Sequence, residues 1–128
     1  MNDPEEAERY LRMARKNAAA LRAMLDPDDF AAEIFGFHAQ QAAEKAIKAW
    51  LALIGAPFPR THDLRFLLLR LEESGLDVGT HWDLVDLNSF AVQFRYEAFD
   101  LSGETLDRES VLQRIEALLT KVEGLVGP

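Results

Sequence analysis

The sequence predicts an all-α protein, folded as an up-and-down bundle of four to five antiparallel helices. Apolar residues recur at intervals of three and four along the chain, and no segment shows the alternation of polar and apolar residues that is typical of a strand. Proline and glycine separate these apolar stripes, and short connections place consecutive helices side by side and antiparallel. The 128 residues are enough for one domain, so we expect a single helical domain over residues 1–128.

The first helix is expected to begin at Pro4. Asp3 can accept hydrogen bonds from the free amides of the first turn, and Pro4 suits the first helical position because its missing N–H costs nothing there. Glu6 follows three residues after this cap. Two neighbouring apolar stripes predict a wide buried face. They consist of Leu11, Ala14, Ala18, Leu21 and Leu25, and of Tyr10, Met13, Ala20 and Met24.

The second helix is expected from Pro27 to Ile54. Its start repeats the aspartate and proline signal of the first helix, and a glycine and two prolines after its end forbid continuation. The start signal consists of Asp26, Pro27 and Asp29. The stop signal consists of Gly55, Pro57 and Pro59.

The two faces of this second helix differ in chemistry. On a wheel of about 100° per residue, one arc is apolar and rich in alanine, which lets another helix approach closely. This arc contains Phe35, Ala39, Ala42, Ala46, Ala49, Trp50 and Leu53. The other arc carries a polar line formed by His38, Gln41, Lys45 and Lys48. Such a line of amide, imidazole and ammonium groups either lies in water or faces a partner.

The first half of the same helix is also apolar on the side that later becomes polar, because Phe30, Ile34 and Phe37 lie there. A helix that is apolar on both sides is buried on both sides. Two explanations stay open. This segment lies in the middle of the bundle, or a second protomer packs against it.

The third helix is expected to open at Thr61, His62 and Asp63 and to close at Gly75. Its buried stripe consists of Leu64, Leu67, Leu68 and Leu71. Asp63 is expected to cap this helix, whereas His62 at a helix start has no such explanation because an imidazole is not especially favourable there.

The fourth helix is expected to start with a capping-box pair, Thr80 and Asp83, and to run to about Tyr96. Its inward residues are Leu84, Leu87, Ala91 and Phe94. A looser stretch from Glu97 to Glu104 separates it from the last helix. The last helix carries Val111, Ile115, Leu118, Val122 and Leu125 in register, flanked by Leu112 and Leu119.

Composition limits the possible functions. The net charge of −8, from 22 acidic and 14 basic residues, argues against a protein that binds nucleic acid by general phosphate attraction, and we expect no DNA binding. The chain has no cysteine, which excludes disulfides and thiolate metal sites. No signal peptide and no apolar run long enough to span a membrane stand in the sequence, so we expect a soluble, cytoplasmic protein.

Few side chains stand in a pattern that carries known chemistry. The three histidines, His38, His62 and His81, lie at no recognised metal-ligand interval, so we expect no metal and no cofactor. Glu44 and Lys48 form an i, i+4 pair, which a surface ion pair would explain as well as a functional role would. Arg95 suits a carboxylate or a phosphate, and nearby acidic residues make a structural ion pair its default role. These acidic residues are Glu97, Asp100 and Glu104.

Three sequence elements, in this order and spacing, resemble the HEPN domain family of helical nucleotide-binding and RNA-cleaving proteins. They are Gln40-Gln41-Ala42-Ala43-Glu44-Lys45, Thr61-His62-Asp63-Leu64 and Phe94-Arg95-Tyr96. The resemblance extends from about Glu5 to Leu125 and implies a helical bundle that forms a two-fold homodimer. Small prokaryotic members are often encoded beside a minimal nucleotidyltransferase, as its binding partner or toxin counterpart. The resemblance implies a polar cleft lined here by Gln41, Lys45, Lys48, His62, Arg95 and Tyr96.

The sequence departs from the nuclease members of this family. Those members have a histidine four to six residues beyond the arginine, whereas Asp100, Leu101 and Ser102 stand at these intervals after Arg95 and no histidine follows His81. Metal-independent RNA cleavage needs one group that moves a proton and a cation that holds the phosphate. The missing histidine removes the first, so the sequence favours a non-catalytic role and leaves an enzymatic one open.

Three functions remain as hypotheses. The first is a non-catalytic HEPN-like binding module that serves as the partner or substrate-binding subunit of a minimal nucleotidyltransferase, in a pair of toxin-antitoxin type. The second is a divergent ribonuclease toxin that uses Arg95 together with His62. The third is a stand-alone nucleotide-binding protein that needs no partner.

Overall fold

The computed structural model describes residues 2–91 and 106–127, and all the regular structure in these two ranges is helical. The elements are α1 (Pro4–Ala23), α2 (Ala32–Ile54), α3 (Leu64–Glu73), the 3-10 helix η1 (Gly79–Leu87) and α5 (Arg108–Val126). Residues 88–91 continue from η1 as α-helix. The prediction of an all-α bundle of four to five helices is confirmed.

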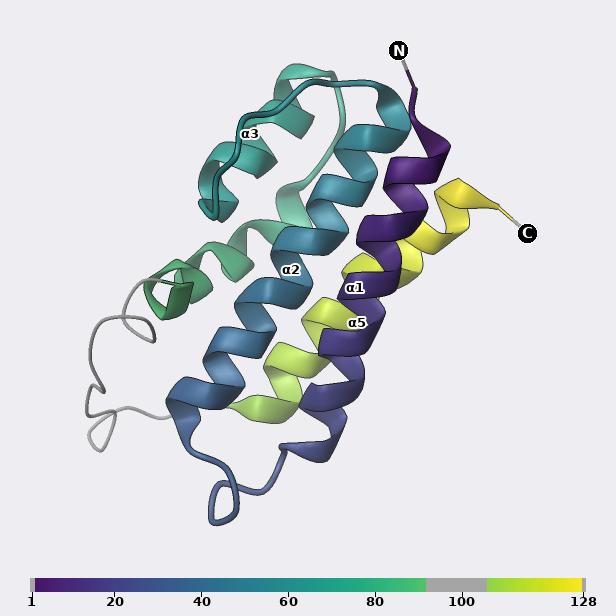
Figure 1. The fold of residues 1–128 in the computed structure, drawn as a ribbon. Helices are drawn as coiled ribbons and strands as arrows, with labels where there is room; N and C mark the ends of the chain where they lie inside the picture. The colour runs from purple at the N-terminus through teal and green to yellow at the C-terminus, as the bar shows by residue number, and fades with distance from the viewer. Residues whose placement is uncertain (1, 92–105, 128) are drawn as a thin grey trace.

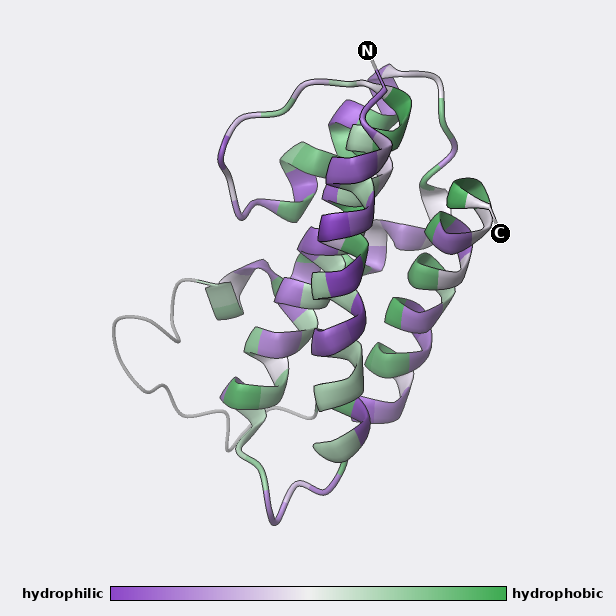
Figure 2. Ribbon diagram, turned by 45° about the vertical axis from the view of Figure 1, so that its right-hand side comes forward, coloured by the Kyte–Doolittle hydropathy of each residue, from purple (hydrophilic) through white to green (hydrophobic). Residues whose placement is uncertain are grey.

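Helix α2 is the centre of the bundle. Helices α1 and α5 pack along one side of it, and α3 and η1 pack against the other side (Figure 1). Hydrophobic and hydrophilic residues alternate along α1 and α5, as expected for helices with one buried face (Figure 2). The core takes alanines and one large aromatic side chain from α2, since Ala39, Ala42, Ala46, Ala49 and Trp50 are all buried.

Helix α1 begins as the sequence predicts. Asp3 Oδ1 accepts the Glu6 N–H at 3.0 Å, and Pro4 takes the first helical position. The stripe from Leu11 to Leu21 is buried, but the second stripe is only partly covered, because Met13 is 44% exposed. The buried face of α1 is therefore narrower than expected.

Helix α2 begins at Ala32, so the predicted start at Pro27 is wrong. Asp26 Oδ1 accepts the Asp28 N–H at 2.8 Å, and the Asp26 carbonyl accepts the N–H groups of Asp29 and Phe30. Residues 26–30 therefore form a single turn that does not continue into α2. Arg108 holds this turn, because its guanidinium donates to the carbonyls of Met24, Asp26 and Phe30 at 2.8, 3.4 and 2.8 Å.

Helices α2 and α3 end at the glycines that the sequence predicts as their stops. Gly55 and Gly75 have φ angles of 76° and 87°, which a residue without a Cβ adopts at no steric cost. The next residue donates back across each glycine, from Ala56 N to the Leu51 carbonyl at 3.0 Å and from Leu76 N to the Leu71 carbonyl at 3.2 Å. Both helices thus end in the same left-handed cap.

The predicted capping box of the fourth helix does not form. Asp77 Oδ1 accepts the Gly79 N–H at 3.0 Å, so η1 begins at Gly79 and Thr80 lies inside it. Asp83 instead pairs with Arg114 of α5 at 2.9 Å. Leu84, Leu87 and Ala91 are buried as expected. Phe94, the end of this helix at Tyr96 and the looser stretch 97–104 lie outside the described residues.

Helix α5 starts at an Asp107 cap, and its buried residues match the predicted register except near its two ends, since Val111 is only half-buried. Ile115, Leu118 and Val122 are buried with the flanking Leu112 and Leu119, whereas Leu125 is 45% exposed. The helix ends at Val126, which is half-buried and packs against the core. Among the described residues, no helix is both long and apolar enough to cross a membrane.

The apolar first half of α2 is not enclosed by the described part of the chain. Phe30 and Ile34 are 36% and 37% exposed, and Phe37 is half-buried. A position in the middle of the bundle therefore does not hold for Phe30 and Ile34. A second protomer on this surface stays a prediction.

Candidate functional site

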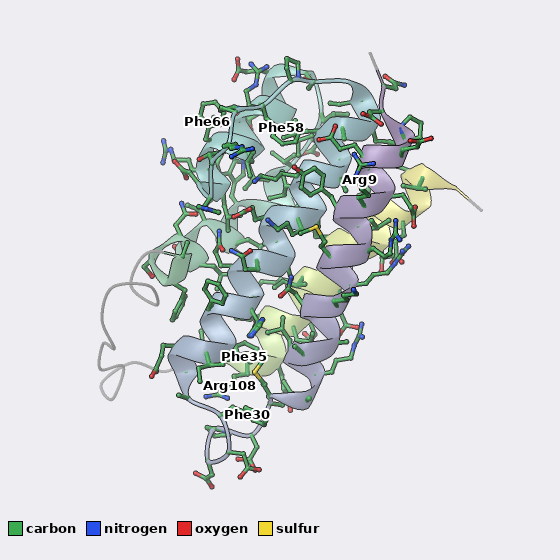
Figure 3. The ribbon with its side chains drawn as sticks, viewed as in Figure 1. Arg9, Phe30, Phe35, Phe58, Phe66 and Arg108 are labelled. Atoms are coloured by element: carbon green, nitrogen blue, oxygen red, sulfur yellow. The ribbon has the colours of Figure 1, made fainter. Side chains whose placement is uncertain are left out.

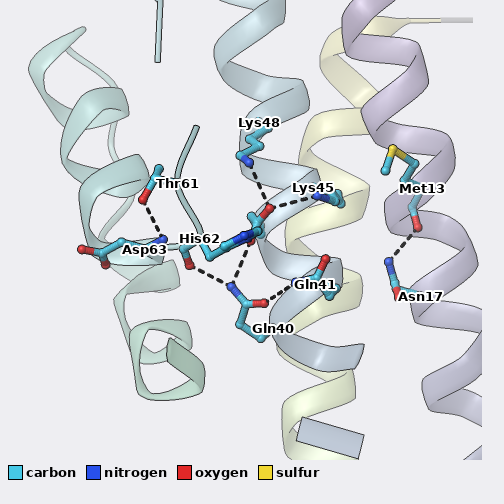
Figure 4. A network of polar contacts seen from close by, with 10 residues as sticks. Met13, Asn17, Gln40, Gln41, Lys45, Lys48, Thr61, His62 and Asp63 are labelled. Carbon is cyan, nitrogen blue, oxygen red and sulfur yellow. Dashed lines mark hydrogen bonds and ion pairs between the residues drawn. The ribbon is translucent and has the colours of Figure 1, made fainter. Parts of the chain in front are cut away.

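A buried carboxylate lies at the centre of a polar network between α2 and the start of α3. The Glu44 side chain has no exposed surface. Its Oε2 accepts from Lys45 Nζ at 2.9 Å and from Lys48 Nζ at 3.0 Å, and its Oε1 lies 2.8 Å from His62 Nδ1 and 3.2 Å from Gln40 Nε2 (Figure 4). We call Gln40, Gln41, Glu44, Lys45, Lys48 and His62 the Glu44 network.

Glu44 stays ionised at neutral pH. Burial acts to raise the pKa of its carboxyl, but the hydrogen bonds from Lys45, Lys48 and His62 outweigh it and lower the pKa from 4.5 to about 2. An ionised carboxylate can only accept hydrogen bonds, so the proton between the two groups resides on His62 Nδ1. Glu44 is therefore a fixed negative charge that orients its neighbours, and it does not exchange protons near neutral pH.

The local sequence explains how the network forms. Gln40, Glu44 and Lys48 recur at intervals of four and so share one face of α2. His62 reaches them from the loop before α3, where Gln40 Nε2 also donates to the His62 carbonyl at 2.8 Å. Gln41 Nε2 completes the chain of hydrogen bonds by donating to Gln40 Oε1 at 2.7 Å.

The start of α3 is fixed by a second set of hydrogen bonds. Asp63 Oδ1 caps the helix by accepting the Arg65 N–H at 3.0 Å, as the sequence predicts. Asn88, at the end of η1, donates to Asp63 Oδ1 at 2.9 Å and accepts the Leu64 N–H at 2.8 Å. Because α3 is tied to η1 in this way, the adjacent His62 backbone has a defined position beside α2.

A family model for the HEPN domain matches residues 7–125 of the chain. The chain belongs to the HEPN family. No curated protein and no solved structure matches it in the corresponding comparisons. The resemblance inferred from the sequence is thus confirmed, and five of the six residues of the Glu44 network belong to two of the three elements that carry it.

Four of the six residues predicted to line the HEPN cleft come together in the structure. Gln41, Lys45, Lys48 and His62 all belong to the Glu44 network. Arg95 and Tyr96 lie outside the described residues. That these residues form a binding cleft stays a prediction, but their grouping shows which part of the bundle to test.

The sequence did not identify the residue at the centre. A surface ion pair between Glu44 and Lys48 was one explanation of their spacing, and it is wrong because their side chains are 0% and 8% exposed. A lysine can be buried when its ammonium group pairs with a carboxylate, as Lys48 does with Glu44. The Tyr10 ring also lies over Lys48, with its centroid 6.0 Å from Lys48 Nζ. The signal in the sequence was the i, i+4 repeat of Gln40, Glu44 and Lys48 among alanines.

His38 belongs to a separate contact. Its Nδ1 lies 3.1 Å from Asn17 Oδ1 of α1. Asn17 Nδ2 in turn donates to the Met13 carbonyl at 3.1 Å, the contact drawn in Figure 4. The residues of the polar line predicted along α2 therefore do not act as one set. His38 joins α2 to α1, whereas Gln41, Lys45 and Lys48 join the network.

The Glu44 network carries an excess of positive charge in an acidic protein. Lys45 and Lys48 contribute two positive charges against the single negative charge of Glu44. Within residues 2–91 and 106–127, no group of three or more histidine, cysteine or acidic side chains is arranged to hold a metal ion. The described arrangement thus suits recognition of an anionic group by fixed ammonium and imidazole donors.

Proposed function

We propose that this HEPN protein is a non-catalytic binding module that serves as the partner or substrate-binding subunit of a minimal nucleotidyltransferase, in a pair of toxin-antitoxin type. The observation that carries the proposal is the Glu44 carboxylate, which holds Lys45, Lys48 and His62 in fixed positions. Donors that are already oriented lose little entropy when an anionic group binds. The phosphates of a nucleotide, or an acidic segment presented to the transferase, have the matching charge.

The state of Glu44 also supports binding over proton transfer. With a pKa of about 2, its carboxylate is a very weak base at neutral pH. We further propose that the module acts as a homodimer, because Phe30, just before α2, and Ile34 of α2 leave an apolar surface that a second copy would cover.

The test is co-purification. The neighbouring genes are inspected for a minimal nucleotidyltransferase, the two proteins are expressed together, and the tagged HEPN chain is recovered. We expect the transferase to co-purify and Lys45→Ala to reduce its recovery. Lys16→Ala, at an exposed position of α1, is the matched control and leaves recovery unchanged. Absence of such a gene, together with failure to capture any small nucleotidyltransferase, contradicts the proposal.

Calorimetry separates this proposal from stand-alone nucleotide binding. ATP is titrated into the HEPN chain alone and into the co-purified pair. The binding-module proposal predicts heat that depends on the transferase. Saturable heat with the HEPN chain alone, lost in Lys45→Ala, would assign nucleotide binding to this chain without a partner.

One observation favours a second function, a divergent ribonuclease toxin. Glu44 accepts from His62 Nδ1 at 2.8 Å, and a carboxylate in this position orients an imidazole in the way that general bases are oriented. Such an enzyme would use His62 with Arg95. Expression of the chain alone should then slow growth, and Arg95→Ala should relieve the effect. Harmless expression and intact RNA in vitro would remove this alternative.

A further inference from the structure

A second polar site lies beside Lys48. A cavity of about 590 Å³ opens between the start of α1, the end of α2 and the loop 55–60. Cavities of this size hold small molecules. The cavity shares Lys48 with the Glu44 network but contains neither Lys45 nor His62, so it is a separate candidate site.

The walls of this cavity are held in place before any ligand arrives. Asp3 N donates to the Ala52 carbonyl at 2.9 Å, which joins the start of α1 to the end of α2. Arg70 Nε and one of its terminal nitrogens donate to the Pro57 carbonyl at 3.3 and 2.9 Å, which fixes the loop. Pro57 and Pro59 restrict this loop further, because proline allows little variation in φ.

Two cations and two carboxylates line the cavity, and one of the cations, Lys48, is also paired with Glu44 at 3.0 Å. The cations are Lys48 and Arg60, and the carboxylates are Asp3 and Glu6. Among the described residues, the charged groups of Arg60 and Glu6 make no hydrogen bond or ion pair. Lys48 is 6% exposed and has three N–H donors, for which the described residues supply one hydrogen-bond acceptor, Glu44 Oε2. The site therefore offers both donors and acceptors to a ligand.

Aromatic rings form the apolar part of the wall. The Tyr10 and Phe58 ring centroids are 6.1 Å apart with the rings tilted at 58°, and Phe58 lies at the α1 side of the loop (Figure 3). Burial, with the charges of Glu6 and Glu44, raises the pKa of the Tyr10 phenol, so this group stays a neutral hydrogen-bond donor. An apolar side chain can pack against these two rings.

We propose that this cavity binds a free α-amino acid with a large apolar side chain. Its carboxylate would lie against Lys48 and Arg60, its ammonium against Asp3 and Glu6, and its side chain against Phe58. Charge decides between this ligand and a nucleoside monophosphate. A zwitterion matches a lining that presents both cations and carboxylates, whereas a phosphate with nearly two negative charges would face two carboxylates. This inference does not rest on the function proposed above.

The experiment is a titration of the full chain by calorimetry with three related probes. The probes are L-phenylalanine, 3-phenylpropionate, which lacks the ammonium, and 2-phenylethylamine, which lacks the carboxylate. We expect saturable binding of L-phenylalanine and at least roughly tenfold weaker binding of the other two, because each loses hydrogen bonds to charged groups. Equal binding of the three probes, or no saturable heat from L-phenylalanine at millimolar concentration, would overturn the proposal.

Two neutral variants assign the ends of the ligand. Glu6→Gln should weaken L-phenylalanine about tenfold and leave 3-phenylpropionate unchanged, and Arg60→Gln should weaken L-phenylalanine by a similar factor and leave 2-phenylethylamine unchanged. Glu5→Gln and Arg12→Gln change the same residue types at exposed positions outside the cavity and should have no effect. Loss of binding in these controls as well would overturn the assignment.

Adenosine monophosphate is the competing probe. Displacement of L-phenylalanine by this nucleotide, with loss of its binding in Arg60→Gln, would assign the cavity to nucleotides and overturn the amino-acid proposal. Capture of a nucleotidyltransferase tests a different surface through Lys45, which does not line the cavity. The two proposals can therefore fail independently.

Discussion

Glu44 shows how one side chain can organise several others. Its carboxylate has no contact with water, and two ammonium groups, an imidazole and an amide surround it. A buried ion is stable only when its remaining lone pairs are satisfied, and here each oxygen accepts two hydrogen bonds. Removal of its charge therefore affects every neighbour at once.

Glu44→Gln should lower the free energy of unfolding by about 3 kcal/mol. Breaking a buried ion pair costs about 3 to 5 kcal/mol, and the lower end applies because Lys45 is 14% exposed and can turn toward water. Urea unfolding measures the change. Glu8→Gln removes a carboxylate from an exposed pair with Arg15 and should cost less than about 1 kcal/mol. Equal losses in the two variants would contradict the central role of Glu44.

The stabilisation by the ionised Glu44 carboxylate should also appear in the pH dependence of the free energy of unfolding. The pKa of Glu44 is about 2 in the folded chain, below its ordinary value of 4.5, so the folded state favours the ionised form. Its contribution is complete above pH 4.5 and is lost as the pH falls toward 2. The difference of pKa corresponds to about 3 kcal/mol. Between pH 4.5 and 2, the free energy of unfolding of the Glu44→Gln variant should therefore fall by about 3 kcal/mol less than that of the wild-type chain. Parallel plots of unfolding free energy against pH for the two chains would refute this expectation.

What the sequence predicts at this scale depends on whether a residue acts alone or through its neighbours. Asp3 and Asp63 cap their helices as predicted, because a cap depends on residues within one turn. Glu44 depends on His62, which is 18 residues away along the chain. Its burial follows from the packing of α3 and its loop against α2, and no local pattern contains that information.

At the scale of the elements, the sequence predicts the interiors of the helices and the helix ends at glycines well, but it predicts the first residues of the helices less well. The stops at Gly55 and Gly75 depend on a single backbone conformation. The start of α2 moves from Pro27 to Ala32 because Arg108, far along the chain, binds the carbonyls of the preceding turn. The capping box at Thr80 fails because Asp77 accepts the Gly79 N–H first. In both cases a competing hydrogen bond decides the boundary.

The packing of α2 against the segment after η1 leads to a further prediction. A Cβ added at Gly36 would clash with ring carbons of Phe90, which is buried. Gly36→Ala should therefore lower the free energy of unfolding by about 1 to 3 kcal/mol, as overpacking does. The matched control is Gly124→Ala in α5, where a Cβ would meet no atom within 4 Å and should stabilise the helix by about 0.5 to 1 kcal/mol. Thermal unfolding of both variants checks the opposite signs.

At the scale of the whole molecule, the apolar surface at one end of the bundle bears on assembly. Phe30 lies in the connection between α1 and α2, whereas Phe66 of α3 lies at the opposite end (Figure 3). Both are partly exposed, as is Ile34. The dimer expected for a HEPN protein would use the end that carries Phe30 and Ile34.

Ile34→Glu should convert a dimer into a monomer, because a charge at a packed apolar interface is costly to bury. The mass in solution, measured by light scattering or sedimentation, reports the change. Phe66→Glu introduces the same charge at an exposed position of α3 and should leave the mass unchanged. A monomeric wild-type chain, or equal behaviour of the two variants, would contradict the predicted interface.

The guanidinium of Arg108 has a consequence for the order of folding. It joins α5 to carbonyls that are 84, 82 and 78 residues earlier in the chain, and its carbon lies 5.3 Å from the centroid of the Phe35 ring (Figure 3). Contacts this distant along the chain form only after the intervening segments have assembled. Arg108 should therefore make these contacts late in folding, after the transition state. Its replacement by methionine should accelerate unfolding while the refolding rate in stopped-flow experiments stays nearly constant.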